Sequence, residues 1–362
     1  MDCPHIPKIP YSEFSEHIHN KVALGRLPLD GTIEITLRCN LRCVHCYCND
    51  DPLKKEMSFK EICRVLDEIT DAGCLWLLFT GGEPLLRPDF IDIYTYAKKK
   101  GLIITLFTNA TLITPYIADY LKDYPPFVIE ITLYGITKQT YEQVTAMPGS
   151  YERCMEGIRL IRQRNLPLKL KTMVTSLNKH ELWQIKAFAE ESGVDFRFDP
   201  VLNPRIDGSR GPCQFRISPQ EVVGLDLADA KRSEEWKRFC EEYCHLDFPD
   251  KLFACQAGVT SFHIDPYGQL QLCGMVRQFS YSMPEGSFKE GWDDALLRFR
   301  SRKEGLHQQC KKCEAIHICD LCPGWSQLEN NDLGSPVEYL CEIAHLRAQA
   351  FMTENRKVKQ EV

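Results

Sequence analysis

The chain has 362 residues, of which 44% are hydrophobic, a size that allows one large domain and a smaller second one. Its 44 basic and 50 acidic residues give a net charge of −6, and no run of like charges favours binding to a nucleic acid. The N-terminus lacks a secretory signal pattern, and the longest apolar runs are too short to span a membrane, so we expect a cytoplasmic protein without a membrane partner.

Short apolar segments alternate with amphipathic ones between residues 31 and 200. Residues 32–37 alternate in period two, and residues 58–73 predict a helix that begins with a Ser58–Glu61 capping box and ends at Gly73. Further strands are expected at residues 74–79, 102–107, 127–133, 168–174 and 195–200, and further helices at 87–101, 114–124, 150–165 and 180–193. This alternation predicts an α/β fold, a parallel sheet curled into a partial (β/α)6 barrel.

The remaining segments predict the domain organisation. Residues 1–30 form a leader expected to cap the open side of the barrel, with His17 and His19 in solvent. A Pro- and Gly-rich break at residues 203–212 marks a boundary, which assigns the barrel to residues 31–203. A linker with a helix capped by Ser218 is expected at residues 204–254, a cysteine-rich domain organised by metal at 255–346, and a solvated tail at 347–362.

The 18 cysteines are unevenly placed, and in a reducing compartment metal binding explains them better than disulfides. One group, Cys39, Cys43, Cys46 and Cys48, directly follows the first strand. Structural zinc sites favour paired C-x-x-C motifs, whereas C-x-x-x-C-x-x-C supplies three close thiolates without a partner pair. A cluster of four irons held by three cysteines leaves one iron free to bind a substrate.

Three further motifs follow the next strands: residues 80–84 ("TGGEP"), 108–110 ("TNA") and 132–135 ("TLYG"). The carboxyl ends of adjacent parallel strands share one edge, where α/β folds assemble their sites. Each motif alone is more typical of an ordinary turn. Together, and beside a thiolate group, they predict a functional site.

These motifs resemble those of the radical S-adenosylmethionine (SAM) enzymes. The resemblance implies that one [4Fe–4S] cluster is held by Cys39, Cys43 and Cys46. It implies that SAM is bound by Gly81, Gly82, Glu83 and Pro84, which receive its amine, and by Asn109 and Thr132. In the family an electron, from a flavodoxin- or ferredoxin-type donor, cleaves SAM to a 5′-deoxyadenosyl radical. "TNA" departs from the commoner "TNG", and Cys48 has no counterpart, so we expect it not to be a ligand.

Seven C-terminal cysteines resemble the SPASM domain, which usually carries two auxiliary [4Fe–4S] clusters. The resemblance assigns one cluster to Cys255, Cys273 and Cys322 and the other to Cys310, Cys313, Cys319 and Cys341. The first set is one ligand short. Cys240 or Cys244 fills the gap, or the site stays open to substrate, or it holds no cubane. The spacing from Cys319 to Cys322 is one residue shorter than usual, and zinc in this domain is an alternative.

SPASM-type members commonly modify peptides, so the leading hypothesis is maturation of a ribosomally made peptide by crosslinking, epimerisation or oxidation, with a separate leader-recognition protein as a partner. Gly274 stands where the sulfatase-maturing branch has a carboxylate base, which argues against formylglycine formation. Alternatives are an enzyme of cofactor or small-molecule biosynthesis, for example on tetrapyrroles, and a noncatalytic iron–sulfur or zinc protein. Asp199 and Tyr134 are weak candidates for a catalytic base.

Overall fold

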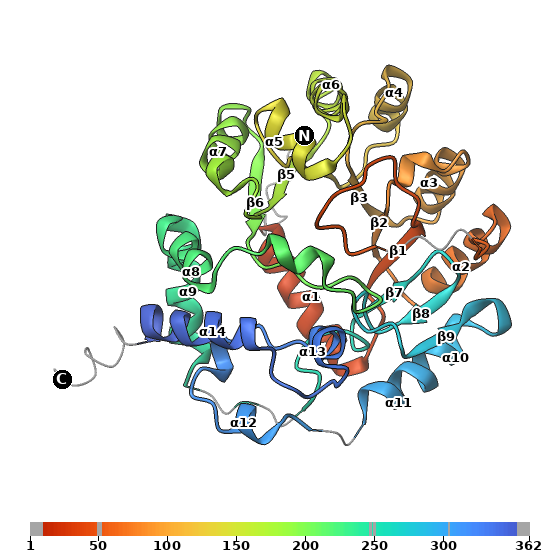
Figure 1. The fold of residues 1–362 in the computed structure, drawn as a ribbon. Helices are drawn as coiled ribbons and strands as arrows, with labels where there is room; N and C mark the ends of the chain where they lie inside the picture. The colour runs from red at the N-terminus through yellow and green to blue at the C-terminus, as the bar shows by residue number, and fades with distance from the viewer. Residues whose placement is uncertain (1–9, 49–52, 246–247, 249–250, 303–304, 353–362) are drawn as a thin grey trace, which may run out of the picture.

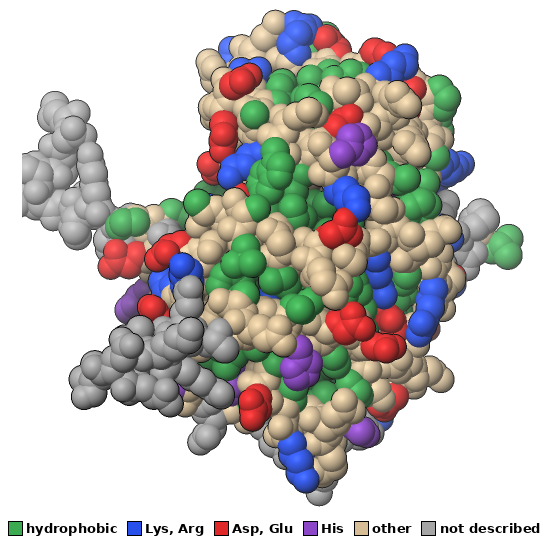
Figure 2. All heavy atoms as spheres, turned by 60° about the vertical axis from the view of Figure 1, so that its left-hand side comes forward, with side chains coloured by type: hydrophobic (Ala, Val, Ile, Leu, Met, Phe, Trp, Pro, Cys, Tyr) green, Lys and Arg blue, Asp and Glu red, His purple; other side chains and the backbone are tan. Residues whose placement is uncertain are grey.

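The computed structural model describes residues 10–48, 53–245, 248, 251–302 and 305–352 (Figure 1). An arc of helices surrounds the strands, and the C-terminal helices lie along one side of this arc (Figure 1). On the face seen in Figure 2, acidic and basic side chains are interspersed. Within the described ranges, no helix has the length and apolar character needed to cross a membrane. The expected tail at residues 353–362 lies outside these ranges.

The partial barrel predicted from the sequence is confirmed. Its parallel strands are β1 (Asp30–Thr36), β2 (Trp76–Gly81), β3 (Ile103–Thr108), β4 (Val128–Thr132), β5 (Leu168–Met173) and β6 (Asp195–Asp199). Its predicted helices are α2 (Phe59–Asp71), α3 (Phe90–Lys99), α4 (Pro115–Asp123), α6 (Ser150–Gln163) and α7 (Leu182–Glu191). A further helix, α5 (Lys138–Thr145), was not predicted, because its eight residues are too few to show a clear hydrophobic period.

Helix α2 shows how local sequence sets an element's ends. The Ser58 side chain accepts a hydrogen bond from the Glu61 N–H, and the Glu61 carboxylate accepts one from the Ser58 N–H, as the capping box predicts. Gly73 follows the helix with φ 101°, a conformation that favours glycine. The buried face, Ile62, Val65, Leu66 and Ile69, packs this helix onto the sheet.

The sheet continues beyond the barrel strands. Its order is β6-β5-β4-β3-β2-β1-β7-β8-β9, in which β7 (Ser261–Ile264) pairs in parallel with β1. Strands β8 (Gln269–Gln271) and β9 (Ser280–Ser282) complete it as antiparallel neighbours. One hydrophobic core also runs from Ile33 in the barrel to Leu296 near the C-terminal region. Strand β1 therefore has parallel partners on both sides, one of them more than 200 residues away along the chain.

The leader contains helix α1 (Tyr11–Gly25), which packs against the amino-terminal ends of the strands. His19 Nε2 lies 2.6 Å from the Asp30 carboxylate at the start of β1, and the His19 ring stacks on Trp76 at the start of β2. Tyr11 contacts Phe127, just before β4, with ring centroids 5.0 Å apart. The expectation that His19 is solvated was wrong, because tertiary packing supplies both of these partners.

The C-terminal half contains more helix than its sequence suggested. Helix α8 (Pro219–Ala228) begins at the predicted Ser218 cap, and α9 (Ala230–Tyr243) follows it. Further along are α10 (Phe288–Glu290), α11 (Leu297–Arg300), α12 (Gln308–Lys311), α13 (Pro323–Asn330) and α14 (Glu338–Arg347). Buried Arg347 pairs with Asp226 at 2.8 Å and with Asp320, so charge as well as apolar contact holds α14 against α8.

A buried ionic network joins the barrel to the C-terminal region. Glu34 on β1 is 1% exposed, and its carboxylate lies 2.8 Å from the Arg277 guanidinium and 3.6 Å from His263 Nε2 on β7. Burial alone would raise the pKa of Glu34, but His263 and Arg277 outweigh it and hold the pKa at about 2. The ionised carboxylate is thus the form that the folded chain stabilises.

Replacing Arg277 by Met should lower the free energy of unfolding by about 3–5 kcal/mol, because it leaves a buried carboxylate without its cation. The double variant Glu34→Gln/Arg277→Met should recover most of this loss. Since folding lowers the pKa of Glu34, its stabilising effect is present above its ordinary pKa of 4.5 and lost as the pH falls toward 2. Urea-induced unfolding at several pH values measures both effects.

Arg298→Met is the matched control, because Arg298 pairs with Asp294 at an exposed site and such pairs contribute about 0–1 kcal/mol. An equal loss in the Arg277 and Arg298 variants would show that the network does not stabilise the joint.

Candidate active site

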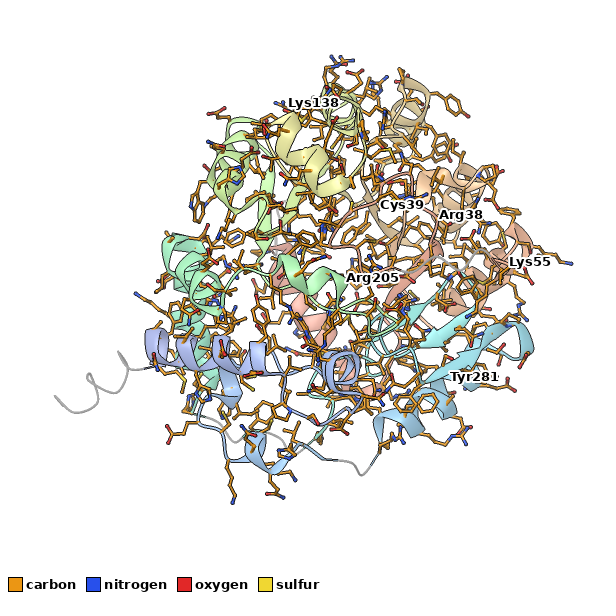
Figure 3. The ribbon with its side chains drawn as sticks, in the orientation of Figure 1. Arg38, Cys39, Lys55, Lys138, Arg205 and Tyr281 are labelled. Atoms are coloured by element: carbon orange, nitrogen blue, oxygen red, sulfur yellow. The ribbon has the colours of Figure 1, made fainter. Side chains whose placement is uncertain are left out.

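The predicted cluster loop, residues 37–48, follows β1 and is held by α5. Arg42 and Val44 donate backbone hydrogen bonds of 3.0 Å to Thr145 and Val144 at the end of that helix. The loop turns between Cys43 and Cys46, whose backbone groups bond at 3.0 Å. In Figure 3, Cys39 and Arg38 lie inside the arc of helices. A helix that the sequence did not reveal therefore supports the loop.

The thiols of Cys39, Cys43 and Cys46 are close enough to affect one another's ionisation. Burial and then the neighbouring charges raise the pKa of Cys39, to about 11, and raise that of Cys43 further. Three partly buried thiolates are unfavourable together unless cationic groups compensate them. The donor set therefore fits an iron–sulfur cluster, whose irons bind the thiolate form.

Cys48 differs from the other three. Its thiol bonds to Cys46, which together with Arg205 lowers the pKa of Cys46 to about 7 despite burial. Arg205 also donates to the Cys46 carbonyl at 3.3 Å, and the adjacent Ile206 N–H donates to Tyr47. The predicted boundary segment thus packs on the cluster loop, and sequence reasoning missed Arg205 because only tertiary contact places it there.

The two glycines of "TGGEP" bring this segment against the cluster loop. Gly82 and Glu83 donate backbone hydrogen bonds of 2.8 and 2.9 Å to Thr36 and Arg38. A Cβ at Gly81, which has φ 136°, would lie 2.0 Å from the Thr36 carbonyl oxygen, and one at Gly82 would lie 2.3 Å from that of Arg38. Only glycine allows so close an approach.

Glu83 joins this segment to the end of β3. Its fully buried carboxylate accepts hydrogen bonds from Thr108 Oγ1 at 2.7 Å, from the Asn109 N–H at 2.7 Å and from the Leu85 N–H at 3.1 Å. Burial raises the pKa of Glu83 to about 7. Its side chain thus positions two strand ends, and Pro84 begins a short 3-10 turn behind it.

Asn109 lies directly beside the cluster loop. Its side-chain amide donates to Asn40 Oδ1 at 2.9 Å and lies 3.8 Å from Cys39 Sγ. Ala110 stands where the commoner "TNG" motif has glycine. It has φ 62° and is fully buried, so the chain keeps the conformation that glycine would favour there. Thr132 ends β4 and is in register with Lys171 of β5. The structure therefore brings the predicted SAM-contacting residues to one rim.

The two candidate bases have different environments. The pKa of Tyr134 is raised by burial and by nearby Cys43, with which it shares a hydrogen bond, and its ring packs edge-on against His45 at 4.9 Å. Tyr134 is therefore better placed to support the cluster loop than to accept a proton. Asp199, at the end of β6, accepts a hydrogen bond from the Val201 N–H at 3.0 Å and remains exposed.

The C-terminal cysteines gather in two places. Burial raises the pKa of Cys273 to about 11 and also raises that of Cys322, and nearby Cys255 adds to both effects, so these three cysteines lie close together. The other set lines one small apolar pocket: Cys310, Cys313, Cys319 and Cys341. His345 lines the same pocket, with Nε2 3.8 Å from Cys313 Sγ, and its place in α14 gave no sequence signal.

Cys240 and Cys244 pack in the hydrophobic cluster that contains Cys313 and Cys319. Their position is thus beside the second set, whereas the first set is the one that lacks a ligand. In the described part of the chain, no group of three or more His, Cys, Asp or Glu side chains is arranged to hold a single metal ion. The ligand sets accordingly stay proposals.

Comparison with known proteins identifies the family. Residues 33–189 match the model of the radical SAM superfamily. An AdoMet-dependent heme synthase from Methanosarcina barkeri is 27% identical over 83% of this chain and 93% of its own length. A PqqA peptide cyclase from Bradyrhizobium diazoefficiens is 29% identical over 81% of this chain and 80% of its own length.

The fold also has solved counterparts. The crystal structure of Streptococcus suis SuiB bound to the precursor peptide SuiA superposes with a TM-score of 0.70 at 16% identity, covering 94% of this chain and 84% of that one. At that identity the likeness concerns the fold alone. The family match at the barrel, with the strand-end motifs gathered on one rim, shows that this chain is an enzyme of the radical SAM superfamily.

Proposed function

We propose that Cys39, Cys43 and Cys46 hold the family's [4Fe–4S] cluster and that the adjoining rim binds SAM. The observation that carries this is the pair of backbone hydrogen bonds that Gly82 donates to Thr36, at the end of β1, and Glu83 donates to Arg38, in the cluster loop. These bonds place the segment that would receive the amine of SAM against the loop that would hold the iron. The cluster would supply one electron, and SAM would supply the 5′-deoxyadenosyl radical. The residues of this chain would position SAM and exclude water.

We further propose that the two C-terminal cysteine sets hold auxiliary iron–sulfur clusters. The enclosed pocket of the four-cysteine set supports one complete site, and its apolar lining would shield a cluster from water. The three-cysteine set supports a second site with an open position. The N–H of His345 is well placed to donate to the sulfur of Cys313 and so to stabilise its thiolate.

As substrate we propose a ribosomally made peptide, recognised with a separate leader-binding protein and served by a flavodoxin- or ferredoxin-type electron donor in the cytoplasm. The similarity to a PqqA peptide cyclase over 80% of that protein supports this class. The exposed Asp199 at the strand-end rim is available as a proton acceptor. Tyr134 is not, because its pKa is raised and its ring is packed against His45.

A second candidate is the oxidation of a tetrapyrrole side chain. It is favoured by the similarity to an AdoMet-dependent heme synthase across 93% of that protein. Both candidates require hydrogen abstraction from carbon and differ in the molecule that enters the barrel.

After anaerobic reconstitution with iron, sulfide, a strong reductant and SAM, the protein should form 5′-deoxyadenosine, measured by mass spectrometry. Cys39→Ala should lower 5′-deoxyadenosine formation at least 100-fold, because it removes a cluster ligand. Cys48→Ala should keep both the cluster and SAM cleavage. If Cys48→Ala loses both, Cys48 is a ligand and our ligand set is incorrect.

Gly82→Ala should weaken SAM binding at least tenfold, since the added Cβ would lie 2.3 Å from the Arg38 carbonyl oxygen and displace the cluster loop. Equilibrium dialysis of labelled SAM measures the affinity. Gly224→Ala is the control, because a Cβ there meets nothing within 4 Å. Equal SAM affinity in the two variants would mean that the close approach does not shape the SAM site.

A precursor peptide encoded beside the gene should raise 5′-deoxyadenosine formation above the substrate-free rate and lose hydrogen, as peptide mass spectrometry would detect. Iron coproporphyrin III should have neither effect. Stimulation by the porphyrin with loss of carbon dioxide, and none by the peptide, would establish the second candidate instead.

A further inference from the structure

Charged side chains line the concave face of the barrel beside the predicted SAM site. Alternate residues of a strand share one face, and the register pairs Thr132 of β4 with Lys171 of β5, and Lys171 with Arg197 of β6. Glu130 lies two residues before Thr132 and so points to the same side. The opposite face of β4 carries Ile129 and Ile131, which are fully buried under the helices.

These side chains form one cluster. The Glu130 carboxylate lies 2.8 Å from the Arg197 guanidinium and 3.4 Å from Lys171 Nζ. Lys171 Nζ also lies over the Phe107 ring on β3, 3.0 Å from its centroid. A carboxylate on β4 and a ring on β3 thus hold the ammonium group of β5 in place. The side chains of Lys171 and Arg197 are 17% and 45% exposed, so solvent reaches both cations.

Within contact distance the cluster has two cations and one carboxylate. One carboxylate, Glu130, contacts both cations, and Lys169 adds another cation on the same face of β5. The acidic residues of β6, Asp195 and Asp199, are in register with Lys169 and Met173, to either side of Arg197. Burial lowers the pKa of Lys171 to about 7; Glu130 opposes this, and Arg197 and Lys169 add to it. The ammonium group of Lys171 thus has one carboxylate in contact and two cations nearby.

We propose that Lys171 and Arg197 bind a carboxylate of the substrate and so hold the substrate beside SAM. A carboxylate would accept hydrogen bonds from both cations, restore charge balance and fit the guanidinium's planar donors. This site rests on the proposed function and deepens it, because it restricts the substrate to a carboxylate-bearing molecule. An acidic peptide side chain and a tetrapyrrole propionate are the two sources of that group.

The position of the cluster fits this role. Lys171 is in register with Thr132, the residue assigned to SAM on the neighbouring strand, so a carboxylate held by Lys171 lies one strand away from SAM. The predicted iron ligands follow β1, on the same rim of the barrel. A substrate held at β5 and β6 would therefore reach toward SAM across the concave face.

The test compares acid and neutral forms of two probes on the reconstituted protein with SAM: coproporphyrin III against its tetra-amide, and a glutamate-containing decapeptide against its glutamine counterpart. Calorimetry without oxygen should show that one acid form binds at least tenfold more tightly than its neutral counterpart. The probe pair that shows this difference identifies the source of the substrate carboxylate. Lys171→Met should remove the preference, since a charge-assisted hydrogen bond is worth about tenfold or more.

Lys289→Met is the matched control, because Lys289 is an exposed cation on α10 that should not affect the preference. Glu130→Gln/Lys171→Met keeps the local charge balance if the single variant folds poorly. In the wild-type protein, the acid probe should also protect Lys171, and not Lys289, from acylation by an amine-reactive ester, as peptide mass spectrometry would show.

Equal binding of acid and neutral forms, or no binding of any probe, would overturn the carboxylate site. Loss of SAM affinity in Lys171→Met without loss of the acid preference would assign the cations to SAM instead and also overturn it. These outcomes are distinguishable from a failure of the proposed chemistry, which would show as absence of SAM cleavage by the wild-type protein.

Discussion

Parallel pairing of β1 on both of its edges is the constraint on which the rest of the structure depends. Because β2 and β7 both run alongside β1, the carboxyl end of β1, where the cluster loop begins, lies within the rim and not at the edge of the sheet. The buried Glu34 network strengthens this joint with charge. The barrel and the first part of the cysteine-rich region thus share one sheet and one hydrophobic cluster.

The cluster loop is an arrangement that the polypeptide alone stabilises poorly. Burial and the neighbouring thiols raise the pKa of Cys39 and Cys43, whereas Arg205 acts on Cys46. Glycine backbone, Glu83 and Asn109 hold the loop without adding a cation. Such a site costs free energy in the absence of a positive group and gains it when iron binds. The same reasoning applies to the enclosed four-cysteine pocket, where apolar side chains surround the thiols.

Charged residues on two sides of the barrel have different roles. At β1 the charges are buried and mutually compensated, as the lowered pKa of Glu34 indicates, so that side serves to hold the structure together. At β5 and β6 the cations are accessible and incompletely compensated. Opposite sides of one barrel can thus use the same residue types for stability and for recognition, because exposure decides which role a charge has.

The sequence by itself determined the barrel, the capping of α2 and α8, and the motifs on the strand-end rim, because these follow from local periodicity and from residues close together in the chain. Tertiary structure decided what depended on distant contacts: the addition of β7 to β1, the contact of His19 with Asp30, the place of Arg205 on the cluster loop and the pairing of Glu130 with Lys171 and Arg197. It also placed His345 in the pocket that is lined by the four cysteines of one expected set. Spacing within a chain fixes which side chains a single loop can present, whereas register between strands, visible only in the fold, fixes which side chains meet.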